Sequence, residues 1–319
     1  MKRPTPAVLF IVFARPDTTA KVFEAIRRAR PAKLYVAADG ARPDKAGEKE
    51  RCDEVRKIVT TVDWPCELRT FFRNENHGCG EQVTEAIGWF FQHEDDGIIL
   101  EDDCLPSRTF FQYCAELLDR YRHDTRVMMI GGNNLEPPRL REEEYSYTFS
   151  RLTYIWGWAT WRRAWKLHDF KMPLFGEVDQ KQYLMPGYSS IYERDLFQYV
   201  FGKMYTGGDT MTSRRNIWDY QWQFACRIHS GLVIVPAVNL VSNIGFGEHA
   251  TSVSGDSPGK GLKCEEIELP LMHPEFIMVE KAREQRTFEL CHTSRKSRLK
   301  SRIRKLVPSA LLSTIRMLY

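Results

Sequence analysis

The stretch that decides the fold is Gly97-Ile98-Ile99-Leu100-Glu101-Asp102-Asp103. Its first four residues form a short apolar run of strand length, and three acidic residues follow at once. Carboxylates held side by side next to a low-dielectric sheet repel one another unless a cation or a hydrogen-bond network offsets their charge. The stretch therefore predicts a buried strand that delivers a charged site at its carboxyl end.

Earlier in the chain, strands alternate with helices. Strands are predicted over residues 8–13, 34–38 and 67–72, and helices over residues 18–29, 44–60 and 79–91. Short apolar runs separated by helices favour an α/β fold, Rossmann-like, with a mostly parallel central sheet and helices on both faces. Ligands of such sheets bind beyond the carboxyl ends of the strands, where Asp39 also lies.

Beyond Asp103 the pattern is more mixed. We predict a helix over residues 107–121 capped by Ser107, strands over 127–130, 145–150 and 232–235, and a helix opened by Trp218-Asp219. We expect one catalytic domain over residues 1–290, with a donor-binding half over 1–131 and an acceptor half over 132–290. Residues 291–319 form a basic tail.

Composition limits the class of protein. The 319 residues are 43% hydrophobic and 28% charged, as in a soluble globular protein. The formal net charge of +4 comes mostly from the tail, so a nucleic-acid surface is not indicated. No apolar run reaches the ~20 residues of a membrane span, and the first one is too short for a signal peptide. The eight cysteines show no Cys-x-x-Cys spacing, so we expect no disulfides and no zinc site.

The acidic run predicts a metal. Carboxylates without His or Cys suit Mn²⁺ or Mg²⁺, which proteins hold through one or two carboxylates while substrate phosphates complete the shell. A nucleoside diphosphate is the matching ligand. The alternative is that Asp102 and Asp103 are solvated loop acids that help to cap the next helix.

Several short motifs, in the same order along the chain, carry a family resemblance. They are Asn76-His77-Gly78, Gly88-Trp89-Phe90-Phe91, residues 97–106, Phe110-Phe111-Gln112-Tyr113, Trp156-Gly157-Trp158 and Trp218-Asp219. Over roughly residues 7–252 the chain resembles the GT-A fold nucleotide-sugar glycosyltransferases, in particular N-acetylglucosaminyltransferase I and its bacterial relatives. That family has a Gly-x-Gly-Trp and a Trp-Asp-Asp-Trp element where this chain has only part of each.

The resemblance implies roles for the residues of the donor side. Asp103 matches the metal-binding aspartate, Asp102 supports the metal or contacts the ribose, and Glu101 faces the donor sugar. Asp39 matches the aspartate that binds the base, usually uracil, and Arg15 matches a basic residue near the phosphates. An ordinary turn aspartate and a surface arginine are the alternatives for the last two.

Other residues are assigned to the same site. Gly40 and Gly78 flank the donor-binding loops, and Trp158 is expected to stack on a sugar ring. His249, in a loop with Gly245 and Gly247, is expected to contact the metal or a phosphate, with a surface histidine as the alternative.

Asp219 matches the catalytic base of the inverting members of the family. Its alternative role is that of an N-terminal helix acid stabilised by the helix dipole. The reaction that the resemblance implies is metal-assisted transfer, with inversion, of a hexose or N-acetylhexosamine from a UDP-linked donor to a hydroxyl of a glycan or lipid-linked acceptor. A nucleotidyltransferase and a non-catalytic nucleotide-sugar-binding protein remain the rival classes.

The tail differs from the body. From Arg295 to Lys305 basic residues dominate without an acid, and Leu299, Ile303 and Leu306 share one helical face. We expect a basic amphipathic helix that binds an anionic membrane surface, with a disordered basic tail as the alternative. The expected location is the cytoplasm, peripheral on the inner membrane, in polysaccharide biosynthesis.

Overall fold

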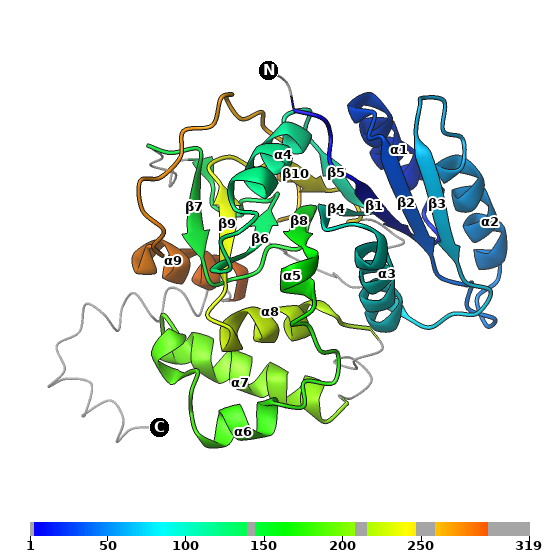
Figure 1. Ribbon diagram of the computed structural model, residues 1–319. Coiled ribbons are helices and arrows are strands. Elements are labelled where there is room, and N and C mark those ends of the chain that lie inside the picture. Colours follow the sequence, from blue (N-terminus) through cyan, green and yellow to red (C-terminus); the bar gives the residue numbers. More distant parts are fainter. Residues whose placement is uncertain (1–2, 139–143, 208–215, 247–258, 293–319) are drawn as a thin grey trace, which may run out of the picture.

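The computed structural model describes residues 3–138, 144–207, 216–246 and 259–292, and it has the α/β architecture that the sequence predicts (Figure 1). The strands are β1 (Val8–Val12), β2 (Lys33–Ala38), β3 (Glu67–Phe72), β4 (Asp96–Glu101), β5 (Cys104–Pro106), β6 (Val127–Gly131), β7 (Tyr147–Ser150), β8 (Trp158–Trp161), β9 (Leu232–Pro236) and β10 (Val241–Asn243). The helices are α1 (Pro16–Ala29), α2 (Glu48–Val59), α3 (Cys79–His93), α4 (Phe110–Arg120), α5 (Arg162–Trp165), α6 (Phe175–Gln180), α7 (Ile191–Tyr205), α8 (Asp219–Ile228) and α9 (Lys281–His292), with a 3-10 turn at Met185–Gly187.

Eight of the described strands form one sheet in the order β3-β2-β1-β4-β8-β6-β9-β7. The first four are parallel neighbours, and β6 and β9 are also parallel. The pairs β4–β8, β8–β6 and β9–β7 are antiparallel. Strands β5 and β10 form a separate antiparallel ladder. Parallel pairing of β1, β2 and β4 brings their carboxyl ends to one edge of the sheet.

Side chains of β1 alternate between two buried layers, as the strand period of two requires. Val8 and Phe10 face the layer that contains Val22 of α1 and Val55 of α2. Leu9 and Ile11 face the layer built by α3, α7 and α8, which includes residues such as Val83, Phe201 and Trp222. Helices therefore cover both faces of the sheet, which confirms the predicted α/β class, whereas the helix predicted in the basic tail lies outside the described residues.

Three parts of the second half differ from the sequence expectation. The aromatic segment before Arg162 contains β8, which lies antiparallel between β4 and β6. Helices α6, α7 and α9 were not predicted. Helix α4 begins at Phe110 rather than at residue 107, and its N-cap is Thr109. The Thr109 N–H instead donates to Glu266 at 2.9 Å, a carboxylate that no local pattern could identify.

All eight cysteines are free thiols in this structure. No helix in the described ranges has both the length and the hydropathy that crossing a membrane requires.

Candidate active site at the carboxyl ends of the central strands

The acidic triplet lies where β4 ends. Ile11 of β1 is the register partner of Glu101, and the chain then turns sharply through Asp102 and Asp103 into β5. Asp102 is buried at 6% exposure, and its carboxylate accepts the Phe13 N–H at 3.0 Å. The end of β1 is therefore hydrogen-bonded to the triplet, as expected for adjacent parallel strands.

Arg15 joins two of these acids. Its Nη1 atom donates to Asp102 at 3.1 Å and to Asp103 at 2.8 Å. Burial opposes the charge of the guanidinium, but the two carboxylates outweigh it and raise the pKa of Arg15. Arg15 precedes α1, whose first residue is Pro16. The two carboxylates thus already converge on one positive group.

Arg15 does not fully offset the burial and mutual repulsion of the acids. Burial, with the charges of Asp103 and Asp102, raises the pKa of Glu101 to about 8. Burial also raises the pKa of Asp102 to about 6, although Arg15 counteracts it. Additional positive charge at this edge of the sheet would stabilise the ionised forms of both groups.

Asp219 belongs to the same cluster. It is the first residue of α8, and its carboxylate is close enough to Glu101 to raise the pKa of that group further. Burial raises the pKa of Asp219 itself, while the backbone N–H groups of Asp219 and Tyr220 partly offset the effect. The sequence-distant acid therefore lies within electrostatic range of Glu101, at a helix N-terminus.

Cys79 is a member of this cluster that the sequence did not reveal. It begins α3 and its side chain is exposed to solvent. Burial nevertheless raises its pKa, with Glu101 and Asp219 as the next largest causes. A thiol that water reaches from one side and protein atoms surround elsewhere fits both observations. The only sequence signal was its position after the glycine at the start of α3.

Gly245 is a second residue that the sequence did not assign to the acids. Strand β10 pairs with β5, and the Ile244 N–H continues the contact by donating to the Asp103 carbonyl at 2.8 Å. A Cβ atom at Gly245 would lie 2.5 Å from Asp103 Oδ2. The Gly245 N–H donates to Asn243 Oδ1 at 2.8 Å, which fixes the turn. The glycine lets the backbone pass against the Asp103 carboxylate.

No family model and no curated protein matches the chain. Among solved structures, HddC from Yersinia pseudotuberculosis is similar at 8% identity and a TM-score of 0.32, over 50% of this chain and 77% of that one. A UDP-glucose pyrophosphorylase complexed with UDP-glucose is similar at 8% identity and a TM-score of 0.29, over 51% and 78%. Likenesses this weak decide neither the fold nor the function.

Asp39 has a structural role that the base-binding prediction did not include. Its carboxylate accepts the N–H groups of Gly40, His77 and Gly78 and the Asn76 amide, at 2.9 to 3.2 Å. Four donors use the acceptor capacity of a carboxylate. Asp39 therefore ties the end of β2 to the loop before α3, and the contact of its side chain with a base stays a prediction.

The two glycines assigned to the donor site have packing reasons of their own. A Cβ at Gly40 would lie 2.4 Å from the Glu75 carbonyl carbon. Gly78 has a φ of 86°, a conformation that favours glycine, and it is the N-cap of α3. Both shape the loop that Asp39 holds, so their direct contact with a donor stays a prediction.

The predicted sugar-stacking role of Trp158 is wrong. Its side chain is fully buried, stacked on Trp218 with ring centroids 5.8 Å apart and packed against Trp165 and Trp222. Because β8 lies inside the sheet, one face of the strand must fill the core. His249 lies outside the described residues.

The residues fit a divalent cation that is held by one or two carboxylates together with substrate phosphates. The described ranges contain no group of three or more His, Cys, Asp or Glu side chains arranged to hold a metal alone. Asp102 and Asp103, however, both pair with the guanidinium of Arg15, so they already converge on one positive charge. Their ligand atoms would be oxygens, which Mn²⁺ and Mg²⁺ prefer. Phosphate oxygens of a substrate would have to complete the shell.

Proposed function

We propose that the chain is a metal-assisted glycosyltransferase that moves a hexose or N-acetylhexosamine from a UDP-linked donor to an acceptor hydroxyl, with inversion. The observation that carries the proposal is the position of Asp219. From the start of α8 it lies near enough to Glu101, at the end of β4, for its negative charge to raise the pKa of Glu101. A metal-binding acidic run and a separate basic carboxylate are the two parts that a single displacement needs.

The donor side would use the triplet and Arg15. Asp103 and Asp102 would hold Mn²⁺ or Mg²⁺, which when bound stabilises negative charge on the departing diphosphate. Arg15 already lies beside both carboxylates and would add its own charge to that stabilisation. Glu101 would face the sugar, and its raised pKa lets it donate a hydrogen bond to a sugar hydroxyl near neutral pH.

Asp219 would accept the proton of the acceptor hydroxyl. An aspartate of ordinary pKa, about 3.9, is a weak base, and burial raises the pKa of Asp219 toward the range that suits general base catalysis. The backbone N–H groups at the start of α8 orient its carboxylate. Attack from the side opposite the diphosphate inverts the anomeric carbon.

Asp219→Asn tests this assignment, with the exposed Asp195→Asn as the matched control. We expect turnover of the donor to fall by roughly 10²–10⁴ in Asp219→Asn while UDP binding is kept. Asp195→Asn should behave as wild type. Near-wild-type turnover in Asp219→Asn would remove it as the base.

A nucleotidyltransferase is the rival that shares the acids. Such an enzyme needs backbone N–H groups around a triphosphate, usually from a glycine-rich loop. Here α1 starts with Pro16, which has no N–H, directly after Arg15. Assays of UDP release from a panel of nucleotide sugars with Mn²⁺, beside assays of UTP with sugar 1-phosphates, separate the two: UDP release supports transfer, and pyrophosphate release from UTP supports the rival. Metal-independent binding without turnover supports a non-catalytic module.

A glycan or lipid-linked acceptor in surface polysaccharide synthesis suits this reaction, with the protein on the cytoplasmic face of the inner membrane. The basic tail is the sequence feature that supports membrane association. A chain that ends at His292 should bind anionic liposomes less strongly than the full chain.

A further inference from the structure

Two asparagines follow β6, and both are buried. The amide nitrogen of Asn134 donates to the Pro236 and Ala237 carbonyls at 2.8 and 3.2 Å. Its Oδ1 atom accepts the Glu136 N–H at 2.9 Å. Asn133 is only 3% exposed, yet its Oδ1 atom has no hydrogen-bond partner within the described residues. A buried amide oxygen without a partner destabilises a fold, so it needs a reason outside the fold.

Asn133 lies at the same edge of the sheet as the acids. Strand β8 is antiparallel to both β4 and β6, so β4 and β6 run in one direction and end at one edge. Asn133 comes two residues after β6 ends at Gly131, as Asp103 comes two residues after β4 ends at Glu101. Only β8 separates the two strands, so their ends are about 10 Å apart. One ligand of the size of a disaccharide can contact both ends.

The neighbours of Asn133 decide which face of the sheet it shares. A Cβ atom at Gly131 would lie 2.9 Å from Tyr154 Cβ, in the buried layer that contains α8. A Cβ atom at Gly132 would lie 2.6 Å from Phe110 Cε2, in the opposite layer. Side chains of consecutive residues in an extended segment alternate, which assigns Asn133 to the α8 side.

Helix α8 brings Asp219 to the end of β6. Gly231, three residues after the helix, packs against Met128 near the start of β6. The Trp222 indole N–H lies 3.4 Å from Met129 Sδ, one residue further along the strand. Followed back from Gly231, the helix therefore runs toward the end of β6, and Asp219 is its first residue.

A second contact fixes the start of α8 at this place. Trp218 stacks on Trp158 with ring centroids 5.8 Å apart, and Trp158 is the register partner of Gly131. The residue before Asp219 is thus tied to the strand next to β6. Asp219 and Asn133 therefore border the same region at the carboxyl edge of the sheet.

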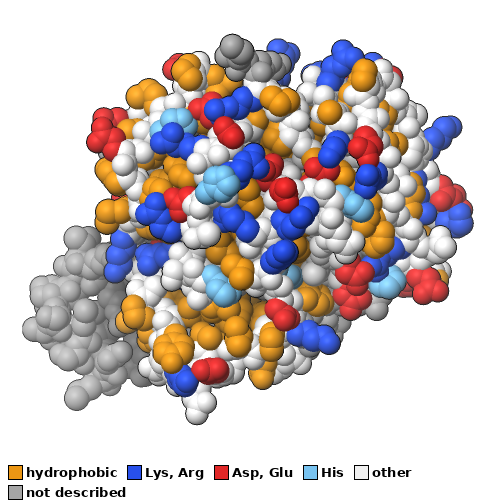
Figure 2. Space-filling model, viewed as in Figure 1, with side chains coloured by type: hydrophobic (Ala, Val, Ile, Leu, Met, Phe, Trp, Pro, Cys, Tyr) orange, Lys and Arg blue, Asp and Glu red, His pale blue; other side chains and the backbone are white. Residues whose placement is uncertain are grey.

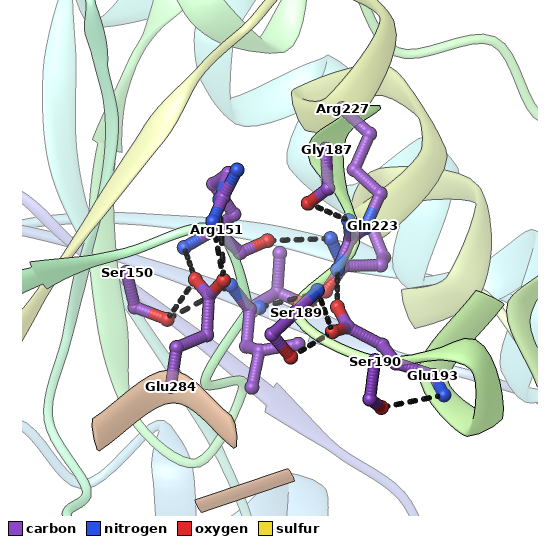
Figure 3. Close-up of polar contacts among 11 residues, drawn as sticks. Ser150, Arg151, Gly187, Ser189, Ser190, Glu193, Gln223, Arg227 and Glu284 are labelled. Atoms are coloured by element: carbon purple, nitrogen blue, oxygen red, sulfur yellow. Dashed lines mark hydrogen bonds and ion pairs between the residues drawn. The ribbon is translucent and has the colours of Figure 1, made fainter. Parts of the chain in front are cut away.

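The rest of α8 is firmly held (Figure 3). Gln223 donates to the Arg151 carbonyl at 2.8 Å, and Arg227 forms a buried ion pair with Glu193 of α7. Contacts of this kind hold a helix at a fixed place, which a residue that takes part in chemistry requires.

The donor side shares the same face. Ile99 of β4 packs in the layer that contains α8, so Glu101, two residues later, lies on that side. The region beside Asn133 is therefore bordered by Glu101, assigned to the donor sugar, and by Asp219, assigned to the acceptor hydroxyl.

We propose that Asn133 binds the acceptor: its side-chain oxygen accepts a hydrogen bond from a sugar hydroxyl adjacent to the hydroxyl that transfers its proton to Asp219. The inference rests on the proposed function and names the acceptor side of the same site. An amide oxygen accepts an O–H without adding charge. The acceptor is then a sugar with two neighbouring free hydroxyls.

Selection by hydrogen bonds agrees with the surface charge. On the face shown in Figure 2, the described basic and acidic side chains are interspersed and form no block of one sign. That face has no extended field with which to select an acceptor by charge. Selection falls instead to groups such as Asn133 that contact individual hydroxyls.

The test compares two adjacent leucine variants, because leucine has nearly the shape of asparagine without its polar atoms. Asn133→Leu removes an oxygen without a partner, whereas Asn134→Leu removes an amide that three backbone groups use. We expect Asn133→Leu to raise the melting temperature by about 2 °C or more, and Asn134→Leu to lower it by at least as much. Asn133→Ala is a second variant that excludes a steric effect of leucine.

Acceptor kinetics separate binding from structure. UDP release from a nucleotide sugar with Mn²⁺ is measured with added methyl glycosides of glucose, galactose and N-acetylglucosamine. We expect the KM of the stimulating sugar to rise at least tenfold in Asn133→Leu and Asn133→Ala, while isothermal titration with UDP and Mn²⁺ gives the wild-type affinity. Asn134→Leu should keep the wild-type KM at a temperature at which it is folded.

The outcomes distinguish this inference from the proposed function. An unchanged KM in both Asn133 variants overturns the inference and leaves the proposed transfer intact. A lowered melting temperature in Asn133→Leu, with the same rise in KM in Asn134→Leu, assigns Asn133 to the fold and overturns it too. UDP release that none of the three sugars stimulates in wild type excludes a sugar hydroxyl as its ligand. If wild type releases UDP from no donor, the proposed function fails and the inference fails with it.

Discussion

Gly245→Ala should displace the Asp103 carboxylate while leaving the protein folded. The added Cβ would lie 2.5 Å from Asp103 Oδ2, 2.8 Å from its Cβ and 3.0 Å from its Cγ. Ordinary contacts between carbon atoms begin near ~3.5 Å, so the carboxylate or the loop must shift by roughly 1 Å. Gly245 is not among the glycines of positive φ, so the backbone itself accepts alanine and the steric clash acts alone.

The consequences for binding and for stability differ in size. Overpacking of this kind costs about 1–3 kcal/mol of folding free energy. If Asp103 holds the metal as proposed, a displacement of its carboxylate by ~1 Å costs about 10²-fold in turnover. We therefore expect a folded protein whose affinity for UDP with Mn²⁺, and whose donor turnover, fall by about two orders of magnitude.

Isothermal titration with UDP and Mn²⁺, beside thermal unfolding, measures both effects. Gly88→Ala is the matched control, because an added Cβ there meets no atom within 4 Å, and the residue lies inside α3. Alanine in a helix interior should stabilise that variant by up to about 1 kcal/mol. If Gly245→Ala binds UDP with Mn²⁺ as tightly as Gly88→Ala, Asp103 is not a ligand of the metal and donor.

Three further predictions concern the core. Trp158→Ala should lower the free energy of unfolding by about 3–5 kcal/mol, because it empties a fully buried site; a melting temperature close to wild type would contradict that placement. Glu193→Gln should cost about 3–5 kcal/mol in urea unfolding by leaving the buried Arg227 without its carboxylate, and the exposed Glu177→Gln serves as control. Burial lowers the pKa of His168 from 6.5 to about 4, so the unfolded chain binds more protons and stability falls as pH drops from 6.5 to 4, by about 3 kcal/mol. His168→Phe should abolish that slope, and an unchanged slope would refute the assignment.

The first half of the fold could be predicted from the sequence because its signals are local. The apolar runs of β1, β2 and β4 are each buried on both faces, and helices of clear period separate them. Parallel strands then place their carboxyl ends together, so Asp39 and Glu101-Asp102-Asp103 could be assigned to one edge of the sheet from the sequence. The bounds differ by only a few residues.

The tertiary structure decided what each of these side chains does. Asp39 follows its strand as predicted, yet its carboxylate is used by the loop before α3, which comes from another strand connection. Trp158 could equally have faced a ligand or the core, and its burial follows from the insertion of β8 between β4 and β6. Neither outcome can be read from the residues near it in the chain.

The acidic run was evident in the sequence, and the family resemblance assigned Arg15 and Asp219 to the same site, but their contacts with the run and the part played by Gly245 were not. Arg15, Asp219 and Gly245 come from three distant segments, and they meet Asp103 or Glu101 only after β1, α8 and β10 have packed. Strand and helix periods record which faces are buried, and they carry no information on which buried ends meet. The sequence determined that a strand ends in three acids. Long-range packing decided that Arg15, Asp219 and Gly245 lie near them.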